Sequence, residues 1–201
     1  MSQVLILNEA EVHRLLTMEE CIGVMEAALG ALARGEAHQP LRGKLFPPGA
    51  TGLLGLMPAY LPPYYGLKEV CVFPGNPARG LDSHLGAVLL HSAETGELLA
   101  IVNAAAVTAI RTAAVSAVAT RLLSREDSTV LAIIGAGVQA RSHLEAIPLV
   151  RPISEVRIYH RGHMEDRHSC LSTFAGPAGQ ARLLSSTWIA RSGLCKGRIL
   201  L

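Results

Sequence analysis

Charged residues are scarce in this sequence, and long uninterrupted apolar runs are absent. Only 17% of the 201 residues are Asp, Glu, Lys or Arg, and 50% are hydrophobic. This composition fits a folded core and excludes an intrinsically disordered chain. The net charge of +2 is too small to favour nucleic acid or an anionic membrane as a partner. No window approaches about eighteen apolar residues without Gly, Pro or charge, so a membrane-spanning helix is not expected.

Cysteines are also few, and Cys21, Cys71, Cys170 and Cys195 show no CxxC spacing. They indicate reduced thiols in a cytoplasmic protein, without a disulfide or zinc framework. No histidine spacing suggests a metal site, and the first residues lack the basic and apolar regions of a signal peptide. The length suffices for one large or two small domains.

The first third of the sequence predicts a strand and two helices before a sheet. Residues 4–7 predict a short strand, and Asn8 with Glu11 forms the capping box of the first helix. A second helix is expected over about 18–34, with Gly35 as the residue that ends it.

Apolar β-rich runs separated by Pro- and Gly-rich turns occupy residues 41–103 and predict a mostly antiparallel sheet. In its last part, the turn at 94–96 joins 85–91 to 97–103 as a hairpin. Residues 104–123 then predict a long alanine-rich helix, whose small side chains imply close packing against its neighbours.

A strand, a glycine-rich turn, a helix and a second strand follow over 129–159 and predict a βαβ unit. The turn reads Gly-Ala-Gly-Val-Gln-Ala from Gly135 to Ala140, which fits the G-x-G-x-x-A dinucleotide fingerprint. Gly135 permits the tight turn, Gly137 admits the pyrophosphate, and Ala140 keeps the helix close to the sheet. The amino end of that helix offers N–H groups and a positive dipole to phosphate. We predict a nucleotide site; the alternative is a glycine turn in another kind of α/β protein.

The end of the second strand bears on the choice of cofactor. An NAD site usually carries Asp or Glu there to bind the ribose 2′-hydroxyl, but residues 158–161 contain no carboxylate. Arg161 can pair with a 2′-phosphate, so NADP is favoured over NAD. The alternative is an ordinary solvated arginine after a strand.

Three basic residues, Arg42, Lys68 and Arg111, lie in segments of the sequence that contain few other charged residues. A guanidinium within the alanine-rich helix needs a partner, either a ligand anion or a protein carboxylate. For Arg111 the two readings are balanced, whereas for Arg42 and Lys68 the pattern alone favours a salt bridge or a solvated side chain. Ser83 and His84 suit cofactor bonding and proton donation, and equally the cap of a strand end.

Together these segments resemble the ornithine cyclodeaminase/mu-crystallin family, over residues 1 to about 161. Several separate motifs occur in the family's order: Leu56–Tyr60, Gly66–Lys68, Ser83-His84, Thr95–Ala100, Thr108–Ala114 and Gly135–Ala140. One departure is Asn103-Ala104, where the family commonly has an Asp-Gly pair before the long helix.

The resemblance implies an α/β protein of two lobes. An α+β substrate-binding and dimerisation domain would span 1–123, and 124–161 would begin an NAD(P)-binding Rossmann domain. The implied activity is NAD(P)-dependent reduction of a cyclic imino acid of the Δ1-pyrroline-2-carboxylate or ketimine type, in a homodimer if the full-length fold is present. The alternatives are an ornithine cyclodeaminase-type lyase, an amino-acid dehydrogenase, and a non-catalytic mu-crystallin-like binding protein or inactive fragment.

By the resemblance, Arg42 and Arg111 hold the substrate carboxylate and Lys68 acts catalytically near the reacting nitrogen. The implied cofactor contacts are Ser83, His84, Arg111, Thr112, Gly135, Ala136, Gly137, Val138, Gln139 and Arg161. Ser83-His84 and Arg161 indicate the ketimine-reductase branch and its NADP.

Residues 162–201 do not continue the resemblance. A Rossmann domain needs further βα units of about 30 residues each, so its six strands cannot be completed here. The segment is rich in Ser and Arg and shows no clean alternation of strands and helices. We hypothesise a non-native tail from a frameshift or altered splicing, which translation of the adjacent DNA in the other frames tests. The family's catalytic aspartate lies in its second half and has no match here, so the activity of this chain is a separate question from that of the family.

Overall fold

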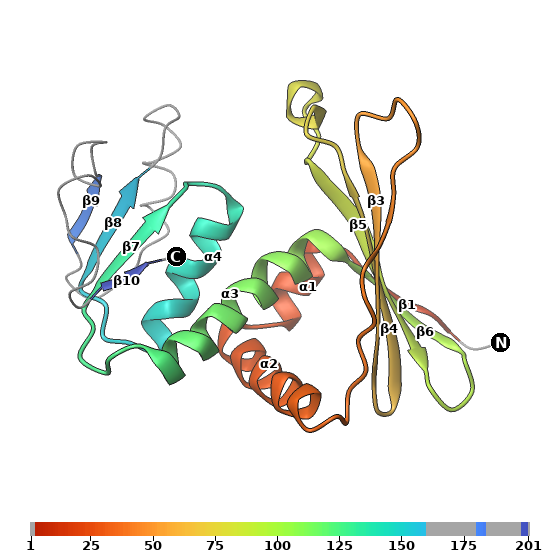
Figure 1. The fold of residues 1–201 in the computed structure, drawn as a ribbon, viewed down its shortest axis with the longest axis horizontal. Coiled ribbons are helices and arrows are strands. Elements are labelled where there is room, and N and C mark those ends of the chain that lie inside the picture. Colours follow the sequence, from red (N-terminus) through yellow and green to blue (C-terminus); the bar gives the residue numbers. More distant parts are fainter. Residues whose placement is uncertain (1–2, 160–179, 184–197, 201) are drawn as a thin grey trace. The chain divides into compact units, whose positions relative to one another are not determined.

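The computed structural model describes residues 3–159, 180–183 and 198–200, which form two compact units (Figure 1). The first unit comprises the chain up to Thr17 together with Glu26–Thr108. The second comprises Met18–Met25 and the chain from Ala109 onward. The boundary between the two units falls inside two helices, after Met25 and after Thr108. The sequence instead predicts domains of 1–123 and 124–161. The helix predicted as a linker contributes most of its length to the second unit, because its later turns bond to elements of that unit.

The first unit contains a six-stranded sheet in the order β1-β6-β5-β4-β3-β2. Only the β1–β6 pair is parallel, so the predicted, mostly antiparallel sheet is confirmed. The strands are β1 (Leu5–Leu7), β2 (Gly43–Leu45), β3 (Leu53–Leu61), β4 (Tyr64–Val72), β5 (His84–Ser92) and β6 (Leu98–Asn103). A short 3-10 helix, η1 (Asn76–Arg79), lies between β4 and β5.

The predicted β5–β6 hairpin is present and turns at Gly96. The backbone there has φ of 77°, a left-handed conformation that glycine adopts without a Cβ penalty. The hydroxyl of Ser92 accepts the main-chain N–H groups of Glu94 and Thr95 at 3.2 Å each. Local turn chemistry therefore sets the pairing of these two strands.

Helix α1 (Glu9–Leu15) begins with the predicted capping box. The side chain of Asn8 accepts the N–H of Glu11 at 3.0 Å, and the Glu11 carboxylate accepts the N–H of Asn8 at 2.9 Å. Helix α2 (Met18–Ala33) is followed by Gly35, whose φ of 77° gives the predicted left-handed end.

Helix α3 (Ala104–Leu123) begins at Asn103, whose side-chain oxygen accepts the N–H of Ala106 at 2.9 Å. Asparagine therefore supplies the cap at the position where the family commonly has aspartate. By length and composition α3 could cross a membrane, a test that a core helix also passes. It behaves as a core helix, because three of its alanines have 0% exposure: Ala113, Ala114 and Ala117.

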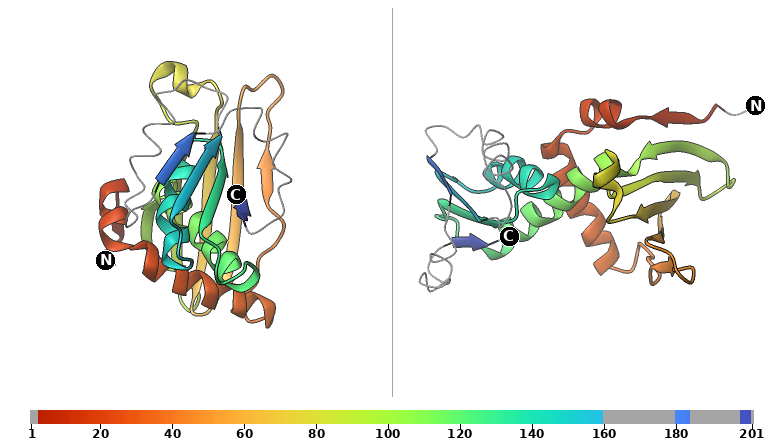
Figure 2. Two further views of the ribbon diagram at one scale, coloured as in Figure 1. Left: turned by 90° about the vertical axis from the view of Figure 1, so that its left-hand side faces the viewer. Right: turned by 90° about the horizontal axis from the view of Figure 1, so that it is seen from above.

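The second unit contains a parallel four-stranded sheet in the order β10-β7-β8-β9. The strands are β7 (Val130–Ile134), β8 (Glu155–Tyr159), β9 (Gln180–Leu183) and β10 (Arg198–Leu200). Numbered within the unit, this order is 4-1-2-3, the arrangement at the centre of a Rossmann sheet. Helix α4 (Val138–Ala146), continued by the 3-10 turn η2 (Ile147–Leu149), covers one face of the sheet (Figure 2). The largest fully buried side chains are those of Leu131, Leu144, Ile147, Val156 and Ile158.

Two of these strands lie in the segment for which no strand–helix alternation was expected. β9 pairs with β8 and β10 pairs with β7, so this segment contributes two short strands that the sequence analysis did not identify. Runs of three or four residues are shorter than the apolar runs that periodicity detects. Arg161 and the rest of the predicted tail lie outside the described residues, and the origin of the tail stays a hypothesis.

Candidate functional site

The turn after β7 has the geometry expected of a dinucleotide-binding loop. Gly135 has φ of 120°, which disfavours any side chain, and its N–H donates to the carbonyl of Tyr159 at 2.8 Å. Gly137 is the N-cap of α4, in an extended conformation that leaves the helix without a side-chain cap. A Cβ built on Gly137 would meet no atom within 4 Å. The amino end of α4 therefore has no side-chain cap among the described residues and has room beside Gly137, as an anion site at a helix terminus requires.

Of the other residues of the motif, two are buried and two are exposed. Ala136 and Ala140 are buried, so their small side chains keep the turn and helix against the rest of the unit. Val138 and Gln139 are exposed on the first turn of α4.

Thr112 carries the second observation that fits a cofactor. Its hydroxyl oxygen is buried and has no hydrogen-bond partner within the described part of the chain. A native fold rarely leaves such a group unsatisfied, because the cost is about 1–3 kcal/mol. Ser116, one helical turn later, bonds to His143 of α4 at 2.8 Å, so this part of α3 lies beside the dinucleotide helix. The orphaned hydroxyl and the uncapped helix end together fit a bound dinucleotide.

Lys68 extends from β4 to α3. Its Nζ donates to the hydroxyl of Thr108 at 2.5 Å, and that hydroxyl donates to the carbonyl of Ala104 at 2.6 Å. The side chain is half-buried and is not the solvated charge that the pattern alone favoured. Sequence reasoning assigned no role to Thr108, although its position three residues before Arg111 places both on one helix face.

Arg111 is half-buried on α3, and its charge acts on Cys21 of α2. Burial raises the pKa of the Cys21 thiol above its ordinary 9.0, and the nearby guanidinium partly opposes that rise. Arg42 lies just before β2 and is exposed. The assignment of both arginines to a substrate carboxylate stays a prediction.

Ser83 and His84 stand at the start of β5. The Ser83 hydroxyl and the Nδ1 of His84 are 2.9 Å apart, and the Ser83 carbonyl accepts the N–H of Phe73 at 2.9 Å. His84 is exposed. These bonds hold the first residues of β5 in place. The role of Ser83 and His84 toward a cofactor stays a prediction.

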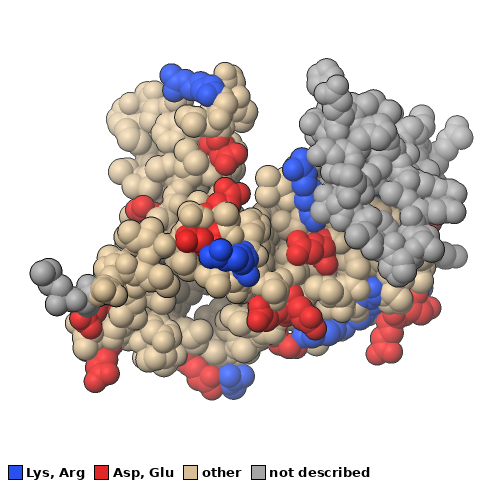
Figure 3. Space-filling model, turned by 180° about the vertical axis from the view of Figure 1, so that it is seen from behind, with Lys and Arg blue, Asp and Glu red and all other residues tan. Residues whose placement is uncertain are grey.

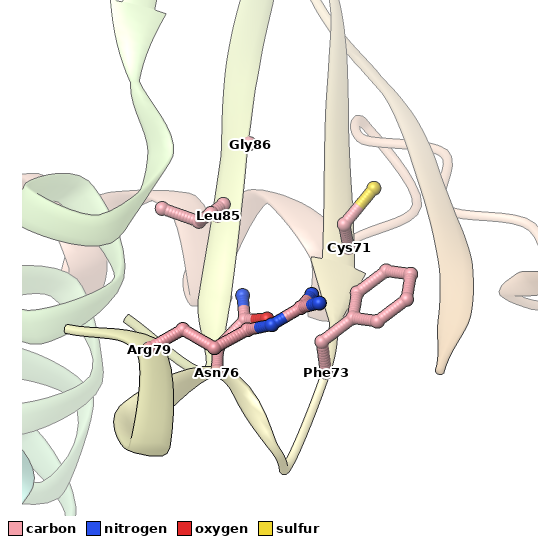
Figure 4. A pocket seen from close by; sticks show the side chains of 6 residues that line it. All are labelled: Cys71, Phe73, Asn76, Arg79, Leu85 and Gly86. Atoms are coloured by element: carbon pink, nitrogen blue, oxygen red, sulfur yellow. The ribbon is translucent and has the colours of Figure 1, made fainter. Parts of the chain in front are cut away.

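A pocket of about 410 Å³ opens where β4 ends and β5 begins (Figure 4). The side chain of Arg79 extends across it toward Phe73, and the amide of Asn76 donates to the carbonyl of Asp82 at 2.9 Å. The lining residues are Cys71, Phe73, Asn76, Arg79, Leu85 and Gly86. None of them is a predicted site residue, so this pocket does not coincide with the predicted site.

Charges on the surface are mixed. Figure 3 shows acidic and basic side chains interspersed over the described part of that face, with no continuous basic stripe. Among the described residues, no three His, Cys, Asp or Glu side chains cluster as metal ligands would.

Comparison with known proteins extends the resemblance. The model of the ornithine cyclodeaminase/mu-crystallin family matches residues 2–180, beyond the limit of about 161 set by the motifs. The mouse ketimine reductase mu-crystallin is 38% identical over 174 residues, which are 84% of this chain and 54% of that protein. The chain spans about half the length of the curated relatives it matches.

Solved structures agree on the fold. An archaeal alanine dehydrogenase dimer with bound NAD superposes with a TM-score of 0.85 at 35% identity, over 90% of this chain and 56% of that one. The Thermococcus litoralis Δ1-pyrroline-2-carboxylate reductase, in complex with NADH and L-proline, gives 0.86 at 32% identity, over 98% and 61%. The chain therefore belongs to the ornithine cyclodeaminase/mu-crystallin family.

Proposed function

We propose that this protein is an NAD(P)-dependent reductase of a cyclic imino acid of the Δ1-pyrroline-2-carboxylate or ketimine type. The observation that carries the proposal is the uncapped amino end of α4 after the Gly135 turn, together with the buried hydroxyl of Thr112, which has no partner among the described residues. The relatives named as ketimine and pyrroline-carboxylate reductases support this reaction class. The cofactor would supply hydride to the carbon of a C=N bond.

The residues that would hold the dinucleotide are those of the turn and of the adjoining helix. The backbone at Gly137 leaves room for the pyrophosphate, and the N–H groups of Val138 and Gln139 would donate to it. Thr112 would bond with its otherwise unused hydroxyl. We assign NADP as the preferred cofactor through Arg161 and keep NAD as possible, since two of the solved relatives hold NAD or NADH.

The basic residues would bind and orient the substrate. We assign Arg42 and Arg111 to the carboxylate, because guanidinium–carboxylate pairs fix orientation as well as charge. Lys68 would lie at the reacting nitrogen, where its ammonium donates a hydrogen bond or a proton. The hydroxyl of Thr108 restrains this ammonium, and Thr108 shares a helix face with Arg111.

A second candidate is an amino-acid dehydrogenase, supported by the likeness to archaeal alanine dehydrogenase. It differs in using an open-chain oxo acid and ammonia in place of a cyclic imine. An ornithine cyclodeaminase-type lyase would release ammonia from ornithine with no net turnover of cofactor.

The test begins with calorimetric titration of the 201-residue chain with NADPH and NADH. Consumption of NADPH is then compared for Δ1-pyrroline-2-carboxylate and for pyruvate with ammonia, and ammonia release from ornithine is assayed separately. Turnover of the cyclic imine supports the proposal, and preference for pyruvate supports the second candidate. A folded sample that binds neither nucleotide overturns both.

We further propose a cytoplasmic homodimer. The face of the first-unit sheet opposite Lys68 is mostly apolar, and Leu54, Cys71 and Leu85 lie side by side across it. Glu69 is a charged residue on this face, paired with Leu56. Leu56, Tyr65 and Leu85 on this face are exposed. An exposed apolar sheet face of this breadth marks a protein–protein interface, and the solved alanine dehydrogenase relative is a dimer.

A further inference from the structure

One side-chain link between α3 and α4 has no role in the function proposed above. The Nε2 of His143 lies 2.8 Å from the hydroxyl of Ser116, and its Nδ1 lies 2.6 Å from the carbonyl of Gln139. The Ser116 hydroxyl also lies within donating distance, 3.3 Å, of the carbonyl of Thr112. The imidazole therefore stands between the main chain of the first turn of α4 and the turn of α3 that carries Thr112.

The ring can be bonded at both nitrogens in either protonation state. Because Nδ1 faces a carbonyl, it carries a hydrogen and donates to Gln139. In the neutral ring, Nε2 accepts the hydroxyl hydrogen of Ser116. In the imidazolium, Nε2 donates to Ser116, and the hydroxyl then turns its hydrogen to the carbonyl of Thr112. The link thus holds the two helices together whichever form is present.

The position of the link connects it to the cofactor site. Gln139 precedes His143 by one helical turn, and Thr112 precedes Ser116 by one turn, while α3 and α4 run side by side in the same direction (Figure 1). The linked pair therefore lies one turn behind the residues assigned to the dinucleotide. Displacement of one helix along the other would move the Thr112 hydroxyl relative to the N–H groups at the start of α4.

We propose that His143 and Ser116 are positioning residues that set the affinity of the dinucleotide site. This inference rests on the proposed function, because it assigns an effect on the same cofactor. Hydrogen bonds to a ligand require donor and acceptor within about 3 Å, so a small shift of α4 against α3 weakens several contacts together. Neither residue is expected to touch the cofactor.

The test uses variants of the whole 201-residue chain. Ser116→Ala removes the partner of Nε2, and His143→Ala removes the link entirely. His143→Gln keeps a donor at the position of Nε2, and His143→Asn keeps one at the position of Nδ1. Ser142→Ala is the matched control, because among the described residues the Ser142 hydroxyl bonds within α4, to the carbonyl of Val138 at 3.2 Å.

The measured quantities are the Kd for NADPH and NADH and, in parallel, the melting temperature. We expect His143→Ala and Ser116→Ala to raise both Kd values about threefold to tenfold, the size of one or two lost hydrogen bonds. His143→Gln should recover part of the affinity on the wild-type background and none when combined with Ser116→Ala. Ser142→Ala should leave both Kd values unchanged.

Each result decides between the proposals. Folded His143→Ala and Ser116→Ala variants with wild-type Kd values, even with lower melting temperatures, overturn the positioning role and leave the proposed function standing. Recovery by His143→Gln in the Ser116→Ala background also overturns it, since the partner is then absent. A wild-type chain that binds neither nucleotide overturns the proposed function and this inference together.

Discussion

The ammonium nitrogen of Lys68 lies 2.5 Å from the hydroxyl oxygen of Thr108. The hydrogen of that hydroxyl is committed to the carbonyl of Ala104 at 2.6 Å, so Thr108 can only accept from Lys68. The lysine is therefore the donor, and this bond occupies one of its three N–H groups. It restrains a flexible side chain between a strand and a helix, as a residue that must meet a substrate atom requires.

Lys68→Met should abolish most of the proposed reductase activity while leaving cofactor binding intact. The methionine retains the apolar stem and removes the ammonium, so kcat/KM for the cyclic imine should fall about 100-fold or more. Thr108→Val is the matched change, which keeps the side-chain shape but loses the acceptor, and a fall of about threefold to tenfold is expected. Steady-state kinetics and NADPH titration measure both. Unchanged kcat/KM in Lys68→Met would contradict the catalytic assignment.

Gly137→Ala should weaken cofactor binding while leaving the stability of the fold nearly unchanged. The added methyl meets no protein atom within 4 Å and the backbone φ is −82°, so the free energy of unfolding should change by less than about 0.5 kcal/mol. The same methyl would occupy the place assigned to the pyrophosphate, and the Kd for NADPH should rise at least about tenfold, or about 1.4 kcal/mol.

Gly135→Ala is the contrasting change at the same turn. Its φ of 120° strains any side chain, so this variant should lose about 1–3 kcal/mol of stability whether or not cofactor is present. Urea unfolding and calorimetric titration measure the two effects. A Gly137→Ala variant that binds NADPH as tightly as the wild type would remove the pyrophosphate from this turn.

Because of the buried Cys21 thiol, the free energy of unfolding should decrease at alkaline pH. Its side chain is 3% exposed, and burial raises the pKa of the thiol above 9.0. The folded chain therefore holds the thiol proton more tightly than the unfolded chain does. This contribution is fully present below about pH 9 and is lost as the pH rises through the folded-state pKa. Urea unfolding at pH 8 and pH 10 should show a smaller loss for Cys21→Ala than for the wild type or for Cys71→Ala.

The Arg151 side chain should contribute strongly to the stability of the second unit. Its side chain is 8% exposed and caps the carboxyl end of α3, where a cation is favoured by the helix dipole. The guanidinium donates to main-chain carbonyls at 2.6–3.1 Å, those of Thr120, Arg121, Ser124, Arg125 and Val150. Arg151→Met removes the guanidinium donor from all five carbonyls, of which those of Thr120 and Arg125 keep a main-chain donor, and should cost about 2–4 kcal/mol in urea unfolding.

The control for Arg151 is Arg141→Met on the exposed side of α4, which should change the free energy of unfolding by less than about 0.5 kcal/mol. Arg151→Lys should recover only part of the loss, because an ammonium cannot reproduce the planar fork. Equal stabilities for Arg151→Met and Arg141→Met would show that the buried bonds contribute nothing net.

Local features of the sequence predicted much of the fold because they act over a few residues. The Asn8–Glu11 capping box, the left-handed Gly96 and the Gly135 turn each need only their own neighbours. The bonds at the candidate site behave differently. Lys68 and Thr108 are 40 residues apart, and Ser116 and His143 are 27 apart, so no local pattern pairs them.

The strands β9 and β10 show a second limit. They are four and three residues long and are recognised through pairing with β8 and β7, which no short apolar run reveals. In a parallel sheet a strand makes its hydrogen bonds with the neighbouring strands. Pairing therefore outweighs the weak strand propensity of a short run of residues. Composition and periodicity therefore revealed no clean alternation of strands and helices in this tail, although two short strands lie in it.

Leu56→Glu should dissociate the proposed homodimer. Leu56 is 37% exposed on this mostly apolar sheet face, beside its cross-strand neighbour Glu69. A second carboxylate at this position would repel that of Glu69 and would have to be buried on association. Sedimentation velocity should show a wild-type dimer and a Leu56→Glu monomer with unchanged circular dichroism. Leu123→Glu is the matched control, because Leu123 is 85% exposed at the end of α3 and lies outside that face. A monomeric wild type, or a Leu56→Glu variant that remains dimeric, would place the association elsewhere or exclude it, whereas dissociation by Leu56→Glu alone assigns the interface to this face of the sheet.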